Sequence, residues 1–125
     1  MFVAAQGGAY SQFKRALERR NFLLAWTLAN ELPRLPRDEA FALLLLARDC
    51  DQGRYVLAAP RWHARLCSEE ALDLDESQIA LAALNGLRDA RRLIAAQVLT
   101  GLFKIHGFDR ELAVLERWLA HPKPP

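Results

Sequence analysis

The chain of 125 residues suits one domain with a single hydrophobic core and is too short for two. Its 17 basic and 15 acidic residues give a net charge of +2, so it lacks the strong overall positive charge that by itself indicates a nucleic-acid-binding protein. Two cysteines are too few for a disulfide-stapled secreted scaffold, and no apolar run approaches the ~20 residues of a membrane span. We therefore expect a cytoplasmic protein with reduced thiols and no membrane contact.

The charges are unevenly distributed along the chain. Residues 1–37 carry six basic and two acidic side chains, residues 38–76 carry four and nine, and residues 77–125 carry seven and four. Two explanations are open. The segments attract one another within the molecule or between subunits, or they form the solvated outer faces of amphipathic helices.

The spacing of apolar residues predicts helices throughout the chain. From Tyr10 to Leu119 apolar side chains recur every three or four positions, and no stretch alternates as a strand would. We expect an all-α fold of about seven helices packed as antiparallel hairpins, either a compact bundle or a short α-solenoid, in a single domain over residues 1–125. Residues 1–8 are predicted to be loose and residues 121–125 to form a proline-rich tail.

Capping residues, glycines and prolines divide this pattern into seven stretches. The predicted helices lie over residues 11–19, 22–32, 38–51, 55–67, 73–84, 89–103 and 109–119. Ser11 caps the first helix, Gly53 ends the third as a left-handed glycine, and Asp73 opens the fifth as part of a capping box. The third helix is apolar nearly all round its middle, so we expect it to be the central and most buried element.

Two resemblances accompany this pattern. Residues 53–58, Gly-Arg-Tyr-Val-Leu-Ala, resemble the Gly-x-Tyr-x-x-Ala that opens the second helix of a tetratricopeptide repeat, and the turns at Asn21, Gly53 and Gly86 are about one helical repeat apart. Residues 9–46 look like small helical proteins of unassigned function from high-GC bacteria. The resemblances imply packed helical hairpins in a bacterial protein and carry no known activity.

No complete catalytic or metal-binding motif interrupts the helices. His63 and Cys67 are four residues apart, the spacing of two zinc ligands on one helix face, but the other histidines and Cys50 have no paired spacing. The serines lie in no nucleophile motif, and no glycine-rich loop could cradle a phosphate. We therefore expect no metal, no cofactor and no catalysis.

A DNA-binding helix-turn-helix is the alternative interpretation. Residues 78–87 resemble the first helix and turn of that motif, which would place Arg88, Arg91 and Arg92 at the start of a recognition helix. The helix that follows is mostly apolar, whereas a helix in a major groove needs polar side chains along its exposed face. Nucleic acid remains a possible partner on this basis.

The main prediction is a non-catalytic module that binds another protein or a second copy of itself. Its binding surface combines basic residues of the first helix with a segment of the fourth, in which a tryptophan is flanked by arginines. The predicted protein-binding residues are Lys14, Arg15, Arg19, Arg20, Arg61, Trp62 and Arg65.

Overall fold

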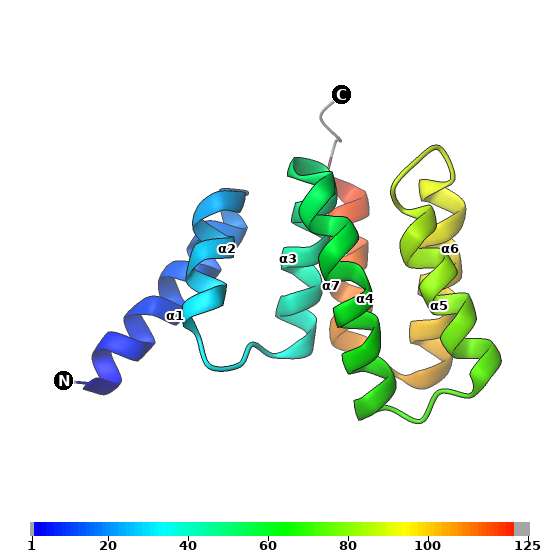
Figure 1. Ribbon diagram of the computed structural model, residues 1–125, viewed down its shortest axis with the longest axis horizontal. Coiled ribbons are helices and arrows are strands. Elements are labelled where there is room, and N and C mark those ends of the chain that lie inside the picture. The colour runs from blue at the N-terminus through cyan, green and yellow to red at the C-terminus, as the bar shows by residue number, and fades with distance from the viewer. Residues whose placement is uncertain (1, 122–125) are drawn as a thin grey trace.

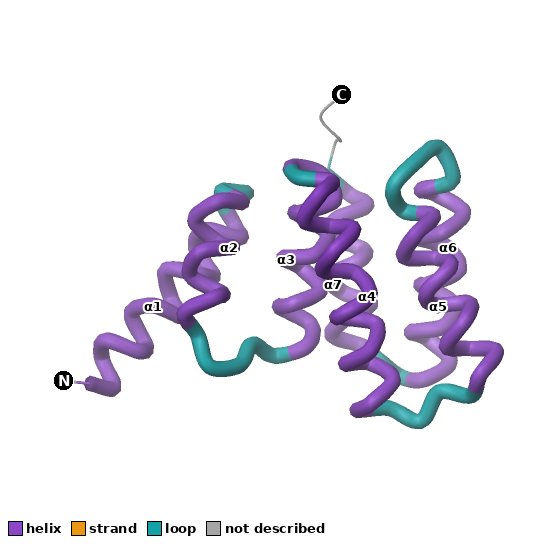
Figure 2. The backbone as a smooth tube through the Cα atoms, viewed as in Figure 1, coloured by secondary structure: helices purple, strands orange, loops and turns teal. Residues whose placement is uncertain are grey.

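The computed structural model describes the backbone of residues 2–121 and the side chains of residues 8–121, and the described backbone forms seven helices without a strand (Figures 1 and 2). The helices are α1 (Phe2–Glu18), α2 (Phe22–Glu31), α3 (Arg37–Cys50), α4 (Gln52–Glu69), α5 (Leu74–Gly86), α6 (Arg92–His106) and α7 (Asp109–Ala120). The predicted all-α class and the number of helices are confirmed. Among the described residues, no helix is both long and apolar enough to cross a membrane.

Helices α3 to α7 form a closed ring. In chain order each packs against the next, and α7 returns to pack against α3. The α1–α2 hairpin lies outside this ring and packs mainly against α3 (Figure 1). It also meets α4, where the guanidinium of Arg54 lies 5.7 Å from the ring centre of Trp26. The arrangement therefore consists of a five-helix bundle with a helical hairpin attached mainly to one of its members.

Helix α3 is the centre of the core, as its sequence predicts. Residues 43–48 are all buried, and Phe41 at the start of the helix is fully enclosed. The Phe41 ring stacks on Trp62 of α4 with centroids 4.6 Å apart, and it meets Phe103 of α6 edge-on at 5.6 Å. Three helices are thus joined by one aromatic cluster, a geometry that adds to the stabilisation from burial alone.

Two predicted helix boundaries are wrong. The first helix does not begin at Ser11: α1 runs from Phe2, so residues 2–8 are helical instead of loose. Gly53 does not end the third helix, because it lies in the first turn of α4. The chain turns instead at Asp51, whose extended backbone and side chain, which accepts a hydrogen bond from the Arg54 N–H at 3.1 Å, cap α4. The predicted tail lies outside the described residues except for His121.

Ion pairs inside the molecule use much of the uneven charge distribution. Arg20 pairs with Asp49 at 2.8 Å and so ties the α1–α2 hairpin to α3. Arg37 pairs with Glu70, the residue after α4, and with Glu111 of α7, at 2.7 and 2.8 Å. Several basic residues of the N-terminal third therefore bind the acidic middle of the same chain, and intramolecular complementarity accounts for part of the pattern.

Candidate functional site

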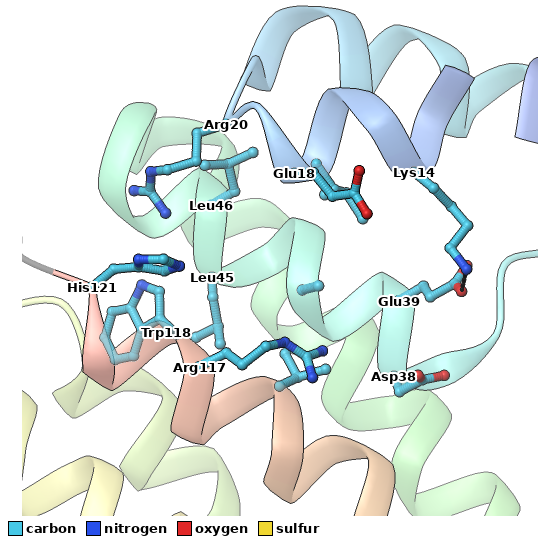
Figure 3. Close-up of a pocket in the computed structure, with 13 residues that line it drawn as sticks. Lys14, Glu18, Arg20, Asp38, Glu39, Leu45, Leu46, Arg117, Trp118 and His121 are labelled. Carbon is cyan, nitrogen blue, oxygen red and sulfur yellow. Dashed lines mark ion pairs between the residues drawn. The ribbon is translucent and has the colours of Figure 1, made fainter. Parts of the chain in front are cut away.

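A cleft lies between α1 and α7, with α3 as its floor (Figure 3). We call it the α1–α7 cleft; its volume is about 560 Å³. Its apolar floor is formed by Leu17, Ala42, Leu45, Leu46, Val114 and Trp118. Its charged rim is formed by Lys14, Glu18, Arg20, Asp38, Glu39, Arg117 and His121. An apolar floor with a charged rim is the composition of a binding groove.

Trp118, which forms part of the cleft floor, is held in place by contacts with residues of α3 and α6. The Trp118 indole N–H donates a hydrogen bond to Asp49 at 2.9 Å, and the guanidinium groups of Arg48 and Arg92 lie 5.8 and 5.4 Å from the centre of its rings. Such cation–π contacts fix the ring plane as well as adding attraction. Trp118 is therefore a fixed part of the packing beneath the cleft and is itself only 5% exposed.

Glu39 is the residue of the cleft whose hydrogen bonding is incomplete. Its Oε2 accepts a hydrogen bond from Tyr10 at 2.6 Å and lies 3.9 Å from Lys14 Nζ. The hydrogen bond to Glu39 raises the pKa of Tyr10 to about 12. The second oxygen, Oε1, is buried and has no hydrogen-bond partner among the described residues. A buried acceptor without a donor is costly, so the position of this oxygen lowers the stability of the fold.

The basic residues predicted on the first helix separate onto two sides of α1. Lys14 and Arg20 line the α1–α7 cleft, where the Lys14 side chain points toward Glu39 (Figure 3). Arg15 and Arg19 lie on the other side, beside α2, and make no ion pair within residues 8–121. The structure therefore does not gather these four residues into one surface.

Arg20 has a structural task as well as a place at the cleft. Its φ is +57°, in the left-handed region, and it ends α1 where a glycine is usual. The residue with this strained backbone is also the one whose side chain forms the ion pair with Asp49. Substituting Arg20 would therefore disturb the fold along with any binding.

Trp62 is not part of a surface, which corrects the prediction for the fourth helix. Its side chain is only 5% exposed, and its indole N–H donates a hydrogen bond to the Arg37 carbonyl at 3.0 Å. The reason is helical spacing: with Tyr55 and Leu66 it belongs to the buried stripe of α4. The spacing of these buried residues is visible in the sequence. The prediction rested instead on the arginines that flank Trp62.

The two arginines beside Trp62 differ in their contacts. Arg65 pairs with Glu69 one turn later at 2.9 Å. Arg61 is exposed and makes no ion pair within residues 8–121. Both line a shallow hollow of about 230 Å³ between α2 and α4, opposite Trp26. This hollow is separate from the α1–α7 cleft and shares no residue with it.

The arginines of the helix-turn-helix alternative do not share one helix face. α6 begins only at Arg92, whose guanidinium lies over Trp118. Arg91 is held by both carboxylate oxygens of Asp89, at 2.9 and 3.1 Å, and Arg88 lies in the loop and bonds to Asn85. The exposed side of α6 is mostly apolar, with Gln97 and Lys104 as its polar members. These contacts give no support to α6 as a recognition helix.

His63 and Cys67 come together with Ser77 of α5. His63 Nε2 lies 2.8 Å from the Ser77 carbonyl, so this nitrogen carries the proton and donates it. The Cys67 sulfur lies 3.6 Å from that nitrogen and 3.3 Å from the Ser77 hydroxyl. Because Nε2 is already a donor, it cannot act as a base toward the thiol. Within the described residues, no three side chains of His, Cys, Asp or Glu gather as metal ligands.

Comparison with known proteins places no relative beside this chain: no family model, no curated protein and no solved structure matches it. The resemblances to tetratricopeptide repeats and to small bacterial helical proteins stay predictions.

Proposed function

We propose that the protein is a non-catalytic protein-binding module that accepts an amphipathic helix of a partner protein in the α1–α7 cleft. One observation carries the proposal: a cleft of about 560 Å³ joins an apolar floor to a charged rim on which Glu18 and Arg117 make no ion pair within residues 8–121. The unpaired thiols of Cys50 and Cys67 fit a reducing compartment, and we place its action in the cytoplasm.

The shape of the cleft favours a helix as occupant. It lies between two helices over a third, so a bound helix would pack its apolar stripe on the partly exposed side chains of Leu17 and Ala42 as another bundle member would. An extended peptide would leave its own backbone groups without partners on this apolar floor. A helix satisfies those groups internally.

The charges on the rim predict which charged side chains the partner helix should carry. Glu18 and Arg117 make no ion pair within residues 8–121, and they lie on opposite walls, on α1 and α7. We therefore expect a partner helix with a cation facing Glu18 and a carboxylate facing Arg117, beside its apolar stripe.

Affinity capture with charge-matched variants tests this function. The tagged chain is used to recover partners from native extract, with nuclease present, as wild type, as Lys14→Glu/Arg117→Glu and as Arg15→Glu/Arg19→Glu. Both variants make the same change of charge, but only the first alters the cleft. We expect a stoichiometric protein that the wild type and the second variant retain and the first loses by about tenfold or more.

Two other results would contradict the proposal. A partner lost with Arg15→Glu/Arg19→Glu and kept with the cleft variant would place binding on the outer side of α1. A partner lost on nuclease treatment would indicate nucleic acid. Circular dichroism of both variants checks that the helices are intact.

A further inference from the structure

The outer side of α6 carries an apolar stripe that nothing in the molecule covers. The stripe comprises Ile94, Val98, Gly101 and Ile105. Successive members are four, three and four residues apart, which places them on one side of the helix. Ile94 is 66% exposed and Ile105 is 77% exposed. A Cβ added at Gly101 would meet no atom within 4 Å.

Helix α5 widens this surface on one side. Its exposed residues Asp75, Ile79 and Ala82 share one side of that helix. The two helices run antiparallel, and Glu76 of α5 pairs with His106 of α6 at 2.7 Å. Ile79, one turn after Glu76, therefore lies along the C-terminal half of α6. We call the surface made by Ile79, Ile94, Val98, Gly101 and Ile105 the α5–α6 face.

The stripe on α6 is complementary to itself. When two copies of α6 lie antiparallel about a two-fold axis through its middle, Ile94 of one copy faces Ile105 of the other. The same operation places Val98 opposite Gly101, where the absent side chain leaves room for the valine. The four-three-four spacing is that of the core positions of a coiled coil. A two-fold dimer needs this kind of self-complementary surface.

Charges at the two ends of the α5–α6 hairpin fit the same arrangement. The end with the connecting loop carries Arg88, Asp89, Arg91 and Arg92, and the other end carries Asp73, Asp75, Glu76 and Lys104. Antiparallel pairing brings the arginine-rich end of one copy onto the carboxylate-rich end of the second. Parallel pairing would place like charges together. Charge therefore selects the same two-fold arrangement as the apolar stripe.

We propose that the α5–α6 face is the interface of a homodimer, in which two copies pack α6 against α6 in antiparallel fashion and the two hairpins form a four-helix bundle. Helices α5 and α6 lie at the end of the molecule away from α1 (Figure 1), so the proposal does not depend on binding in the α1–α7 cleft. Because one hairpin face is small beside the interfaces of permanent dimers, we expect a dissociation constant of about 10 µM.

Sedimentation velocity of the purified chain, from about 1 to 300 µM, tests the dimer. The weight-average mass should rise from the monomer value of 14.1 kDa toward twice that value. Gly101→Glu should remain monomeric at every concentration, because a charged side chain would then face Val98 of the second copy. That variant should keep its helical circular dichroism, since the position is open and glutamate favours a helix more than glycine does.

Two further variants separate this face from other surfaces. Leu23 of α2 is 66% exposed, as Ile94 is, but it lies outside the α5–α6 face. Leu23→Glu should therefore leave dimerisation unchanged. Asp75→Arg should weaken the dimer about tenfold, and adding Arg91→Glu should restore it, because each reversed charge meets the other in the second copy. A chain that stays monomeric at the highest concentration, or a dimer that Gly101→Glu leaves intact, would overturn the proposal.

Discussion

Replacing Glu111 by leucine should destabilise the protein through the arginine it leaves behind. Arg37 Nε donates to Glu111 at 2.8 Å, and the two side chains are 12% and 5% exposed. Removing one partner of a buried pair commonly costs 3–5 kcal/mol, or about 3 kcal/mol here, because Arg37 keeps Glu70 at 2.7 Å and Glu69 at 3.3 Å. Arg37→Met should cost about 4 kcal/mol, since it leaves Glu111 buried without a cation.

The double variant Arg37→Met/Glu111→Leu carries the argument. It replaces both charges with apolar groups of similar size, so we expect a net loss of only about 1 kcal/mol, well below either single change. The free energies of unfolding are measured by guanidinium denaturation at neutral pH, followed by tryptophan fluorescence. If the double variant lost as much free energy of unfolding as the two single variants together, the coupling between Arg37 and Glu111 would be refuted. The buried pair would then contribute nothing specific.

Two further changes test local features. The hydrogen bond to Glu39 raises the pKa of Tyr10 to about 12, from about 10 in an unfolded chain, so its stabilisation is complete below about pH 10 and is lost as the pH rises toward 12. Tyr10→Phe should flatten that part of the pH dependence in denaturant titrations, and an unchanged profile would contradict it. Gly107→Ala should destabilise by about 1 kcal/mol because Gly107 has a φ of +71°, whereas Gly101→Ala should stabilise by a similar amount when measured on the monomer. If both substitutions changed the free energy of unfolding in the same direction, the backbone conformation of the glycine would not be what decides its effect on stability.

The sequence predicts those features that depend on neighbours along the chain. The helices, the central position of α3 and the capping box at Asp73 all follow from local spacing, and the structure confirms them. Gly53 misleads because a glycine can end a helix or lie within its first turn. Asp51, two residues earlier, supplies the cap that decides between these possibilities.

The candidate cleft could be predicted only in part. Lys14 and Arg20 are among the residues that the sequence indicates, but the opposite wall, with Arg117 and Trp118, depends on how α7 closes the ring. That closure joins residues far apart in the chain, and a helical pattern alone does not specify it. Arg117 and His121 are four residues apart in the sequence, and this spacing indicates that their side chains lie on the same side of α7.

The attachment of the α1–α2 hairpin has an energetic consequence. The ring helices each have two neighbours within the ring, whereas the hairpin is joined to it mainly through α3, with the contact of Trp26 and Arg54 of α4 beside it. The hairpin can therefore open as a separate cooperative unit at a lower free energy than global unfolding. A helix bound in the α1–α7 cleft touches both the hairpin and the ring, so part of its binding energy would hold the hairpin shut. Partner affinity and local hydrogen-exchange protection of α1 are thus linked quantities, and a change in either one should appear in the other.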